Sequence, residues 1–513
     1  MNDYRKILDE SYAVCRSLSL SKIDNILLTD AFKTSNINIS LWRIYEVVLT
    51  IYCFTSRNKG ILRKFIHGCA RRYIKAIKRI LKPIDFNDQE IVKLHSNSNT
   101  ILFLGFTKYL AKENFLPLYE LIRKEGLFTP IIITDSNIRN FCIDENFVID
   151  INNLCNNQIK SEEDMIRASL QTLIKDLRYK FRRNGSPTSS LKDFESALSF
   201  IHTYADEVVP IYLSVAHYIL IKYPPKIIVS IDVADPRTRI FTLLANQLNI
   251  PVVQIQAGPI DDNCVEWRFV KDDWIFANGR KGQVALEGQG VAKDQILVVG
   301  SAKHEGVLAF KNFSSLLLRE RFRITQSNKI VLLLSSYTET FSTNSKLRKQ
   351  YLIFEKMLNA IINGIAERSN IVLVIKPHPL EKTDKLNKIA RKQERVYVTG
   401  SKENTTELIA CADAVISYGS TSTLDALLLA KLTICPQFEG WVGDYFQNSG
   451  AVMVPRNEEE FDYVFDKIEQ NRSDELLSSL ENSRLKFMED VSFGMGSGAS
   501  RRIVDNIYLL STN

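Results

Sequence analysis

Residues 370–382 read NIVLVIKPHPLEK, a strand pattern that runs into a loop of reactive and rigid residues. The apolar run 371–375 is typical of a parallel strand that is buried on both faces. After it come Lys376, Pro377, His378 and Pro379. Each proline fixes its own φ at about −65° and restricts the residue before it, so the loop that carries His378 is stiff. Open α/β proteins bind their ligands at such loops, at the carboxyl ends of parallel strands.

Similar apolar runs alternate with helical patterns along the chain after residue 100. A first series of expected strands lies at 101–106, 130–135, 226–232, 251–258, 273–279 and 295–301. A second series lies at 329–336, 371–379, 395–400, 413–420 and 432–436. Strands that alternate with helices favour parallel sheets covered by helices on both faces. The break near 302–328 predicts an α/β fold with two doubly wound, Rossmann-like domains facing a cleft; one large sheet is the alternative.

The expected domains follow from these two series. Residues 1–95 read as helical throughout and form an N-terminal extension. Residues 96–305 form one Rossmann-like domain and residues 306–513 form the other. Within the first of them, residues 160–222 read as mostly helical, with a break at 182–190.

The composition and the N-terminus restrict the class of protein. The eight cysteines are scattered without a CxxC pair, so neither a disulfide framework nor a zinc site is indicated, and a reducing cytoplasm is the simpler location. The N-terminus is charged from its third residue and lacks the apolar core of a signal peptide. No run reaches the roughly 18 apolar residues that a membrane-spanning helix requires.

The net charge of +7 is concentrated between Arg57 and Lys82, where ten Lys or Arg occur with no Asp or Glu. Apolar residues at helical spacing separate the cations, which is the pattern of a basic amphipathic helix. Such a helix either lies on an anionic membrane surface or packs against the protein with a solvated basic face, and the sequence leaves both open. No nucleic-acid partner is expected, because no recognition-helix pattern accompanies the charge.

A second informative stretch, DAVISYGSTSTLDALLLAKLTICP, occupies residues 413–436. Its strand ends near Ser417, and four hydroxyl residues at 420–423 precede an apolar helix. Ser422 and Asp425 have the spacing of a capping box, which predicts Ser422 as the N-cap. The free N–H groups of a helix start bind anions. Alternatively, these hydroxyls only cap the helix.

The two loops should open at the same edge of one sheet, because each follows a parallel strand of the same domain. Together they suit the phosphates of a nucleotide, whose negative charge grows as it leaves. The expected phosphate-binding residues of these loops are Lys376, His378, Pro379, Ser420, Thr421, Ser422 and Thr423. Other strand ends supply further candidate N–H donors at Ser335, Ser336, Gly300 and Ser301.

IKPHP followed by SYGSTSTLDALLLAK resembles the C-terminal domain of GT-B glycosyltransferases. More narrowly, it resembles bacterial surface-polysaccharide enzymes with an "HP" motif and a downstream Ser/Thr motif: Kdo transferases, polysialyltransferases and CDP-glycerol glycerophosphotransferases. In those families the two motifs bind the phosphate and sugar of the donor, which implies this role for His378 and for Ser420 to Thr423. The loop at 251–267 resembles the family's "iQHG" segment, but Ala257 stands where histidine is common, so that histidine's chemistry does not carry over. The likeness covers roughly residues 225–450.

The catalytic base is expected on the N-terminal domain. Asp232 and Asp235 follow a strand and precede a helix, where a carboxylate can accept a proton from an acceptor hydroxyl. Asp235 can instead cap the helix that begins at Pro236. Glu266 and Asp135 are the next candidates. No cofactor is expected, and no cluster of ligand residues indicates a metal.

The resemblance thus implies a glycosyltransferase that moves a sugar from a nucleotide-activated donor to a glycan or lipid-linked acceptor, in the synthesis of a bacterial surface polysaccharide such as capsule or lipopolysaccharide. The N-terminal domain would hold the acceptor and the C-terminal domain the donor. The expected location is the cytoplasm or the inner face of the inner membrane. The alternatives are a nucleotide-sugar 2-epimerase, a polyol-phosphate transferase and a non-catalytic nucleotide-sugar-binding subunit.

Overall fold

The computed structural model describes residues 2–23, 26–31, 33, 39–54, 99–135, 147–154, 157–184, 191–261, 263–335, 348–378, 381, 383–441 and 445–512. The basic segment 57–82, Ser336 and Pro379 therefore lie outside the described residues. The chain divides into two compact units. The N-terminal unit comprises Asn2–Ala302 together with Ser500–Asn513, and the C-terminal unit comprises Lys303–Ala499.

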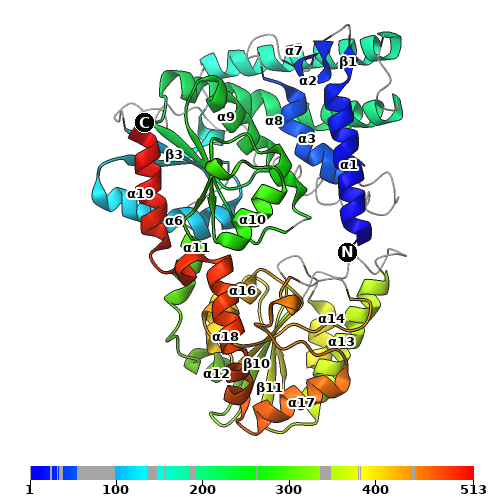
Figure 1. The fold of residues 1–513 in the computed structure, drawn as a ribbon, viewed down its shortest axis with the longest axis vertical. Helices are drawn as coiled ribbons and strands as arrows, with labels where there is room; N and C mark the ends of the chain where they lie inside the picture. The colour runs from blue at the N-terminus through cyan, green and yellow to red at the C-terminus, as the bar shows by residue number, and fades with distance from the viewer. Residues whose placement is uncertain are drawn as a thin grey trace. The chain divides into compact units, whose positions relative to one another are not determined.

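A seven-stranded parallel sheet forms the centre of the N-terminal unit (Figure 1). Its strands are β3 (Thr100–Leu104), β4 (Thr129–Thr134), β5 (Val148–Asp150), β6 (Ile227–Ser230), β7 (Val252–Ile255), β8 (Trp274–Ala277) and β9 (Ile296–Val298). Their order in the sheet is β5-β4-β3-β6-β7-β8-β9. The chain builds outward from β3 in one direction and from β6 in the other, so the topological switch point lies between these two neighbours.

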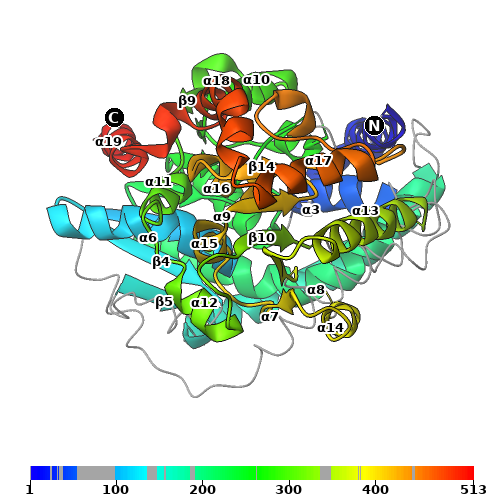
Figure 2. The same cartoon turned by 90° about the horizontal axis from the view of Figure 1, so that it is seen from below.

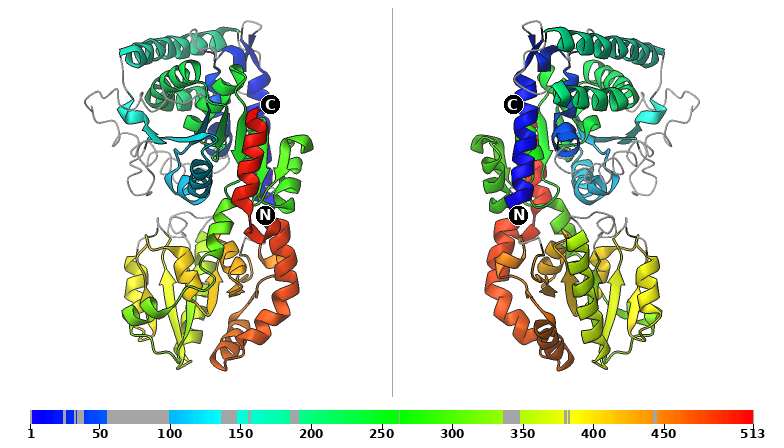
Figure 3. Two further views of the ribbon diagram at one scale, coloured as in Figure 1. Left: turned by 90° about the vertical axis from the view of Figure 1, so that its left-hand side faces the viewer. Right: turned by 90° about the vertical axis from the view of Figure 1, so that its right-hand side faces the viewer.

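Helices cover both faces of this sheet because each strand is apolar on both sides. Ile101 and Phe103 face a cluster that includes residues of α6 (Lys108–Glu125) and α19 (Ala499–Thr512). Leu102 and Leu104 face a cluster that includes residues of α7 (Asn157–Asn184), α8 (Leu191–Lys222) and α9 (Pro236–Gln247). Helix α10 (Arg280–Gly288) connects β8 to β9. Figure 3 shows α19, drawn in red, alongside the green part of this unit.

The N-terminal residues belong to the core of this unit. They form α1 (Asn2–Leu20), β1 (Lys22–Ile23), β2 (Ile26–Leu27), α2 (Leu28–Ala31), α3 (Leu41–Val48) and the π-helix η1 (Leu49–Phe54). The prediction that residues 1–95 are helical throughout is wrong at 22–23 and 26–27, where β1 and β2 pair antiparallel. Two-residue strands are too short to show the period of two that identifies a strand in sequence.

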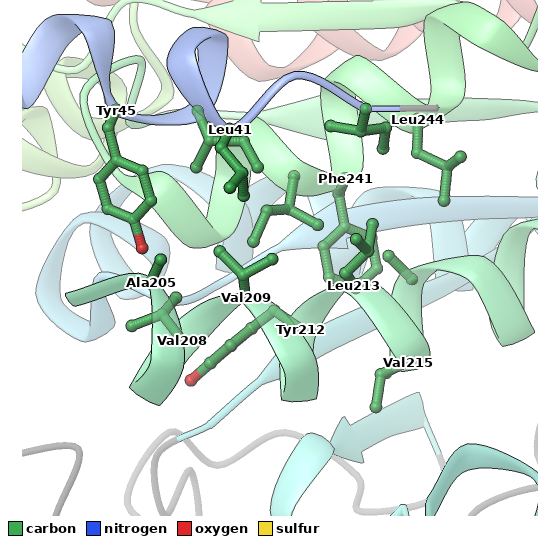
Figure 4. Packing of buried hydrophobic residues seen from close by; sticks show 14 of the residues in the cluster. Leu41, Tyr45, Ala205, Val208, Val209, Tyr212, Leu213, Val215, Phe241 and Leu244 are labelled. Atoms are coloured by element: carbon green, nitrogen blue, oxygen red, sulfur yellow. The ribbon is translucent and has the colours of Figure 1, made fainter. Parts of the chain in front are cut away.

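Helix α3 joins the core through apolar and ionic contacts. Leu41 and Tyr45 lie over side chains of α8 and α9, including Val209 and Phe241 (Figure 4). Close by, Arg239 of α9 forms a buried ion pair with Glu46 at 2.6 Å. Removing two charges from water is costly unless they lie close together. This buried ion pair therefore requires α3 and α9 to pack closely. The described part of residues 1–95 is therefore part of the first unit rather than an appended extension.

The C-terminal unit contains a five-stranded parallel sheet. Its strands are β10 (Lys329–Leu334), β11 (Ile371–Lys376), β12 (Val396–Val398), β13 (Ala414–Ser417) and β14 (Leu432–Ile434). The order β12-β11-β10-β13-β14 places the switch point between β10 and β13. The prediction of two doubly wound domains is confirmed, and the alternative of one large sheet is wrong.

Two layers of helices enclose the second sheet (Figure 2). One face packs against α13 (Arg348–Ala366), α14 (Asp384–Ala390) and α17 (Glu458–Glu469). The other face packs against α11 (Ala302–Leu308), α12 (Leu316–Phe322), α15 (Thr405–Cys411), α16 (Ser422–Leu428) and α18 (Ser473–Val491). Every strand expected after residue 100 is present, and among the described residues of that part the sequence pattern missed only the three-residue strand β5.

The last residues depart from the expected domain limits. Residues 500–513 were assigned to the C-terminal domain, but they belong to the N-terminal unit. Ile503, Val504 and Ile507 of α19 are fully buried in the cluster that contains Ile101 and Phe103. The apolar face of α19 is thus buried against the first sheet. A domain boundary drawn along the sequence cannot show this contact.

Candidate functional site

Three loops of the C-terminal unit begin in one row at the carboxyl edge of its sheet. In the strand register, Leu334 of β10 pairs with Lys376 of β11 on one side and with Ser417 of β13 on the other. Ser335, the Pro377–His378 segment and the loop from Tyr418 onward therefore start side by side, next to the switch point. The prediction that the two motif-bearing loops open at the same edge of one sheet is confirmed.

Glu381 ties two of these loops together. Its carboxylate accepts a hydrogen bond from the Ser335 hydroxyl at 2.9 Å and another from the His378 backbone N–H at 3.1 Å. Its own backbone N–H donates to the His378 carbonyl at 2.9 Å. The sequence analysis did not identify Glu381. The available signal was an acidic residue three positions after His378.

His378 and Lys376 are in different situations. The His378 side chain is half-buried, and burial lowers its pKa, with the positive charge of Lys376 acting in the same direction. The imidazole is therefore neutral near pH 7 and offers one N–H donor. Lys376 is buried, and its ammonium donates to the carbonyl oxygens of Pro377 at 2.9 Å and Ser401 at 2.8 Å. Two of its three N–H groups thus hold the backbone of the site.

Side chains of the hydroxyl-rich loop form hydrogen bonds within the same segment of chain. The Ser420 Oγ accepts the N–H of Ser422 at 3.2 Å, and the Thr423 hydroxyl donates to the Ser417 Oγ at 2.9 Å. The prediction of a capping box is wrong, since the N-cap of α16 is Thr421, without a side-chain bond. Asp425 instead accepts from the Thr406 hydroxyl at 3.2 Å. The Ser420 hydroxyl accepts a hydrogen bond from the backbone N–H two residues later and so forms a local turn. A turn of this kind competes with side-chain capping at a helix start.

Exposure separates the four hydroxyl residues into two groups. Ser420 and Thr421 are exposed, together with Gly419, whose φ of 96° lies in the left-handed region that glycine favours. Ser422 is half-buried and Thr423 has no exposed surface. Ser420 and Thr421 are thus the hydroxyls that a ligand can reach, while Thr423 supports the loop from inside.

Gly300 and Ser301 lie elsewhere. They follow β9, the edge strand of the N-terminal unit, and so do not share a sheet edge with Ser335 and His378. Gly300 has a φ of 89°, and Ser301 is buried. Their positions fit a turn that leads out of the first unit's sheet into α11.

Asp232 lies at the switch point of the N-terminal unit. Its carboxylate accepts hydrogen bonds from the Thr107 hydroxyl at 2.9 Å and from the Ala234 N–H at 3.1 Å. Thr107 follows β3 and Asp232 follows β6, so their contact joins the loops of the two central strands. Burial raises the pKa of Asp232, and the negative charge of Asp235 raises it further. A half-buried carboxylate with a raised pKa at this edge has the properties of a general base.

Asp235 and Asp135 are instead held in an ion-pair network. Asp235 caps α9 by accepting the Arg237 N–H at 2.9 Å, and its carboxylate pairs with the Arg237 guanidinium at 2.6 Å. Asp135 pairs with the same guanidinium and accepts the Tyr212 hydroxyl at 2.5 Å. The interpretation of Asp235 as a helix cap is confirmed. Arg237 neutralises both carboxylates, so Asp232 is the stronger candidate for a base.

Two further residues complete the surroundings of Asp232. Burial raises the pKa of Glu266, and the charge of Asp232 adds to this rise, which places the two carboxylates within electrostatic reach of each other. In the preceding loop, the Gln256 amide donates to the Gly258 carbonyl at 2.7 Å and accepts the Asn278 N–H at 2.9 Å. Gln256 thus fixes the loop in which Ala257 replaces the histidine common in the related motif.

Within the part of the chain that the structure describes, no group of three or more His, Cys, Asp or Glu side chains is arranged to hold a metal ion. Among the same residues, no helix combines the length and the hydropathy needed to span a bilayer.

The fold can be compared with known proteins. No family model and no curated protein matches this sequence. Among solved structures, the UDP-GlcNAc 2-epimerase of Neisseria meningitidis bound to UDP-GlcNAc matches with a TM-score of 0.51 at 12% identity, over 80% of this chain and 100% of that one. A glycosyltransferase of Rickettsia africae matches with a TM-score of 0.51 at 14% identity, over 81% and 99%. This chain has the GT-B fold.

MnaA of S. aureus, solved with UDP, extends the comparison. It matches with a TM-score of 0.50 at 14% identity, over 80% of this chain and 97% of that one. These neighbours include a UDP-GlcNAc 2-epimerase and a glycosyltransferase, so one fold serves both reactions. The GT-B fold implied by the motif resemblance is confirmed, and the choice of reaction depends on the residues of the site.

Proposed function

We propose that this chain is a glycosyltransferase that transfers a sugar from a nucleotide-activated donor to a glycan or lipid-linked acceptor. The observation that carries the proposal is the row of loop starts at Ser335, His378 and Ser420, next to the switch point of the C-terminal unit. Ligands of open α/β sheets bind outside the carboxyl ends of the strands at this point. The donor is therefore assigned to the C-terminal unit and the acceptor to the N-terminal unit.

The loop side chains supply hydrogen-bond donors for the leaving nucleotide. The neutral imidazole of His378 provides one N–H, and the exposed hydroxyls of Ser420 and Thr421 provide two more groups at the loop after β13, on the other side of β10. Negative charge accumulates on the phosphate as the bond to the sugar breaks, and fixed donors lower the barrier by stabilising that charge. Glu381 contributes by holding the His378 loop in place rather than by touching the donor.

The acceptor hydroxyl is deprotonated by Asp232. Thr107 and the Ala234 N–H orient its carboxylate, and the raised pKa makes it more basic than an ordinary aspartate. The proton moves from the acceptor hydroxyl to Asp232 while the acceptor oxygen bonds to the sugar and the nucleotide leaves. Asp235 and Asp135 serve this site indirectly, because they fix Arg237 and the start of α9.

The setting proposed for this reaction is surface-polysaccharide synthesis, on the strength of the HP and Ser/Thr motifs at 376–379 and 420–423. A cytoplasmic enzyme that acts on a lipid-linked acceptor works at a membrane surface, and the basic segment 57–82 is the part of the chain with the charge to bind one. Membrane association remains a prediction from sequence.

A ligand screen followed by product analysis tests the proposal. Melting temperatures are measured with UDP-, GDP-, CDP- and CMP-activated sugars, since a ligand at 100 times its dissociation constant stabilises by about 2.7 kcal/mol. The best donor is then incubated with and without glycan acceptors, and the products are identified by mass spectrometry. A glycosyltransferase yields an elongated acceptor and a free nucleotide. An epimerised nucleotide sugar formed without acceptor, or binding without turnover on native acceptor, would contradict the proposal.

A further inference from the structure

A pocket of about 350 Å³ lies on the N-terminal unit, away from its switch point. Such a volume is within the range of small-molecule sites, roughly 300 to 1,000 Å³. The pocket is lined by Asp30, Lys33, Ile39, Ser40, Arg43, Leu243, Asn246, Gln247 and Lys271. These residues come from α2, the segment between α2 and α3, the start of α3, the last turns of α9 and the loop that leads into β8.

The pocket is at the amino edge of the sheet. Lys271 precedes β8, and the nearby Asp273 N–H donates to the carbonyl of Val252, the first residue of β7. Asp232 and Thr107 lie at the opposite, carboxyl edge of the same sheet. This pocket is therefore separate from the site assigned to the acceptor hydroxyl, and a ligand can bind in it whether or not the chain is a glycosyltransferase.

The pocket carries a net positive charge. Arg43 and Lys271 are exposed and form no ion pair within the described residues, whereas Lys33 pairs with Asp30 at 3.0 Å. Burial raises the pKa of Glu46, and the charges of Arg239, Lys271 and Arg43 all oppose that rise, so these cations lie within electrostatic reach of one carboxylate. Arg239 already pairs with Glu46 at 2.6 Å. The charges of Arg43 and Lys271 are thus left for a ligand.

The acidic residue Asp272, next to the pocket, is buried. Asp272 lines a narrow adjoining cavity, which shares Leu243 and Lys271 with the pocket. Asp272 is 7% exposed, and Arg239 lies within electrostatic reach of its carboxyl group. The open pocket therefore presents its cations, rather than this carboxyl group, to solvent.

The neutral side chains indicate what accompanies the anionic group. The Asn246 Nδ2 donates to the Lys271 carbonyl at 2.6 Å, which leaves the Asn246 Oδ1 buried without a hydrogen-bond partner among the described residues. A ligand that satisfies this oxygen must donate a hydrogen bond, as a hydroxyl does. Ile39 and Leu243 add an apolar wall of the kind that contacts the C–H face of a sugar ring.

We propose that this pocket binds an acidic saccharide, a sugar that carries a phosphate or carboxylate group. Arg43 and Lys271 bind the anionic group, Asn246 accepts a sugar hydroxyl, and Leu243 contacts the ring. The saccharide can be a free sugar phosphate or one unit of an acidic glycan. Inorganic phosphate would satisfy the two cations and leave Asn246 and the apolar wall unused, so it should bind more weakly than a sugar phosphate.

Calorimetric titration of the full-length protein tests this proposal. The probes are glucose 6-phosphate, a galacturonate oligomer, inorganic phosphate and uncharged glucose. The pocket variant is Arg43→Gln with Lys271→Gln, and the matched control is Lys112→Gln with Lys124→Gln, which removes the same charge from exposed positions on α6 of the same unit. Both variants replace exposed side chains, so their melting temperatures should stay near that of the parent.

We expect glucose 6-phosphate or the galacturonate oligomer to bind the parent and the control equally, and the pocket variant roughly tenfold more weakly or worse. A preference for the oligomer identifies a glycan chain as the source, and a preference for glucose 6-phosphate identifies a free sugar phosphate. His378→Ala should retain the binding, because that residue belongs to the other unit. Equal affinities of the pocket and control variants would overturn the proposal. So would phosphate binding as tightly as both saccharides, or saccharide binding that is absent from the parent.

Discussion

The hydroxyl of Thr107 lies 2.9 Å from a carboxylate oxygen of Asp232, a contact that joins the two central strands of the N-terminal unit at their carboxyl ends. The same loop carries Asp235, whose carboxylate is taken by Arg237. Among the described residues, no cation lies within ion-pair distance of Asp232. Two aspartates three positions apart therefore have different chemistry. Asp232 is a carboxylate held by hydrogen bonds alone among the described residues, and Asp235 is half of a buried ion pair.

Asp232→Asn should abolish most turnover while folding persists. The amide keeps the shape of the side chain but cannot accept a proton, and loss of a general base costs typically 10²- to 10⁴-fold in rate. Asp235→Asn is the matched control, because it leaves Arg237 short of a partner and should lower the free energy of unfolding by about 3 kcal/mol. Turnover and thermal unfolding of both variants are measured. Full activity of Asp232→Asn would remove this residue from the mechanism.

The pH dependence gives a second readout for Asp232. Because its pKa is raised, kcat/KM in the parent should increase with pH along a limb centred above the ordinary aspartate value of about 3.9. This limb should disappear in the residual activity of Asp232→Asn.

His378→Ala should reduce turnover by roughly 10²-fold or more, the effect of losing one donor to a developing negative charge. Folding should be nearly unchanged, since the side chain is half-buried on a loop whose backbone is held by Glu381. His202→Ala, an exposed histidine on α8, is the control and should match the parent. A variant at 378 that unfolds, or that keeps full activity, would make the imidazole a structural group.

The hydroxyl loop can be separated into structural and ligand-facing positions. Ser420→Ala removes the acceptor of the Ser422 N–H and should cost about 0.5 to 2 kcal/mol of stability. Ser422→Ala should be close to neutral, because Ser422 is not the N-cap. Thr421→Ala should leave the melting temperature unchanged and weaken donor binding in calorimetric titration. Equal donor affinities of parent and Thr421→Ala would take this loop out of the donor site.

Asp272 should make stability depend on pH. Burial raises its pKa to about 7, whereas an unfolded aspartate titrates near about 3.9. Between these values the folded state binds more protons, so the free energy of unfolding falls as the pH rises toward 7. Asp272→Asn removes this loss of stability at high pH. Relative to the parent, it should therefore raise the melting temperature more at pH 8 than at pH 5. Asp294→Asn, an exposed control, should show no such difference. A parallel pH response of parent and Asp272→Asn would disprove the assignment.

The basic segment remains to be tested at a membrane surface. Replacing five of its cations with Gln should release the protein from phosphatidylglycerol vesicles, because each basic residue near such a surface contributes about 1 kcal/mol. The residues are Arg71, Arg72, Lys75, Lys78 and Arg79. Phosphatidylcholine vesicles serve as the control and should bind neither protein. Vesicle binding that is absent from the parent or unchanged in the variant would identify the segment as a packing element.

The sequence determined the positions of the sheet strands and the edge where the candidate site lies. Runs such as 371–375 are apolar at every position, and only a strand covered on both faces buries them all. The alternation of these strands with helices requires parallel pairing, and parallel pairing places the loops of His378 and Ser420 at the same edge of the sheet. These conclusions depend on local patterns that repeat along the chain, which is why they could be drawn before any contact was known.

The tertiary structure alone decided which polar groups are free to act. Asp232 and Asp235 look alike in sequence, and only the position of Arg237 between Asp135 and Asp235 separates base from ion pair. Glu381 acquires its role from Ser335, 46 residues away. Whether a carboxylate is paired, buried or reachable depends on groups brought together by folding from distant parts of the chain, and the strength of a charge interaction is set by that distance and by the surrounding solvent.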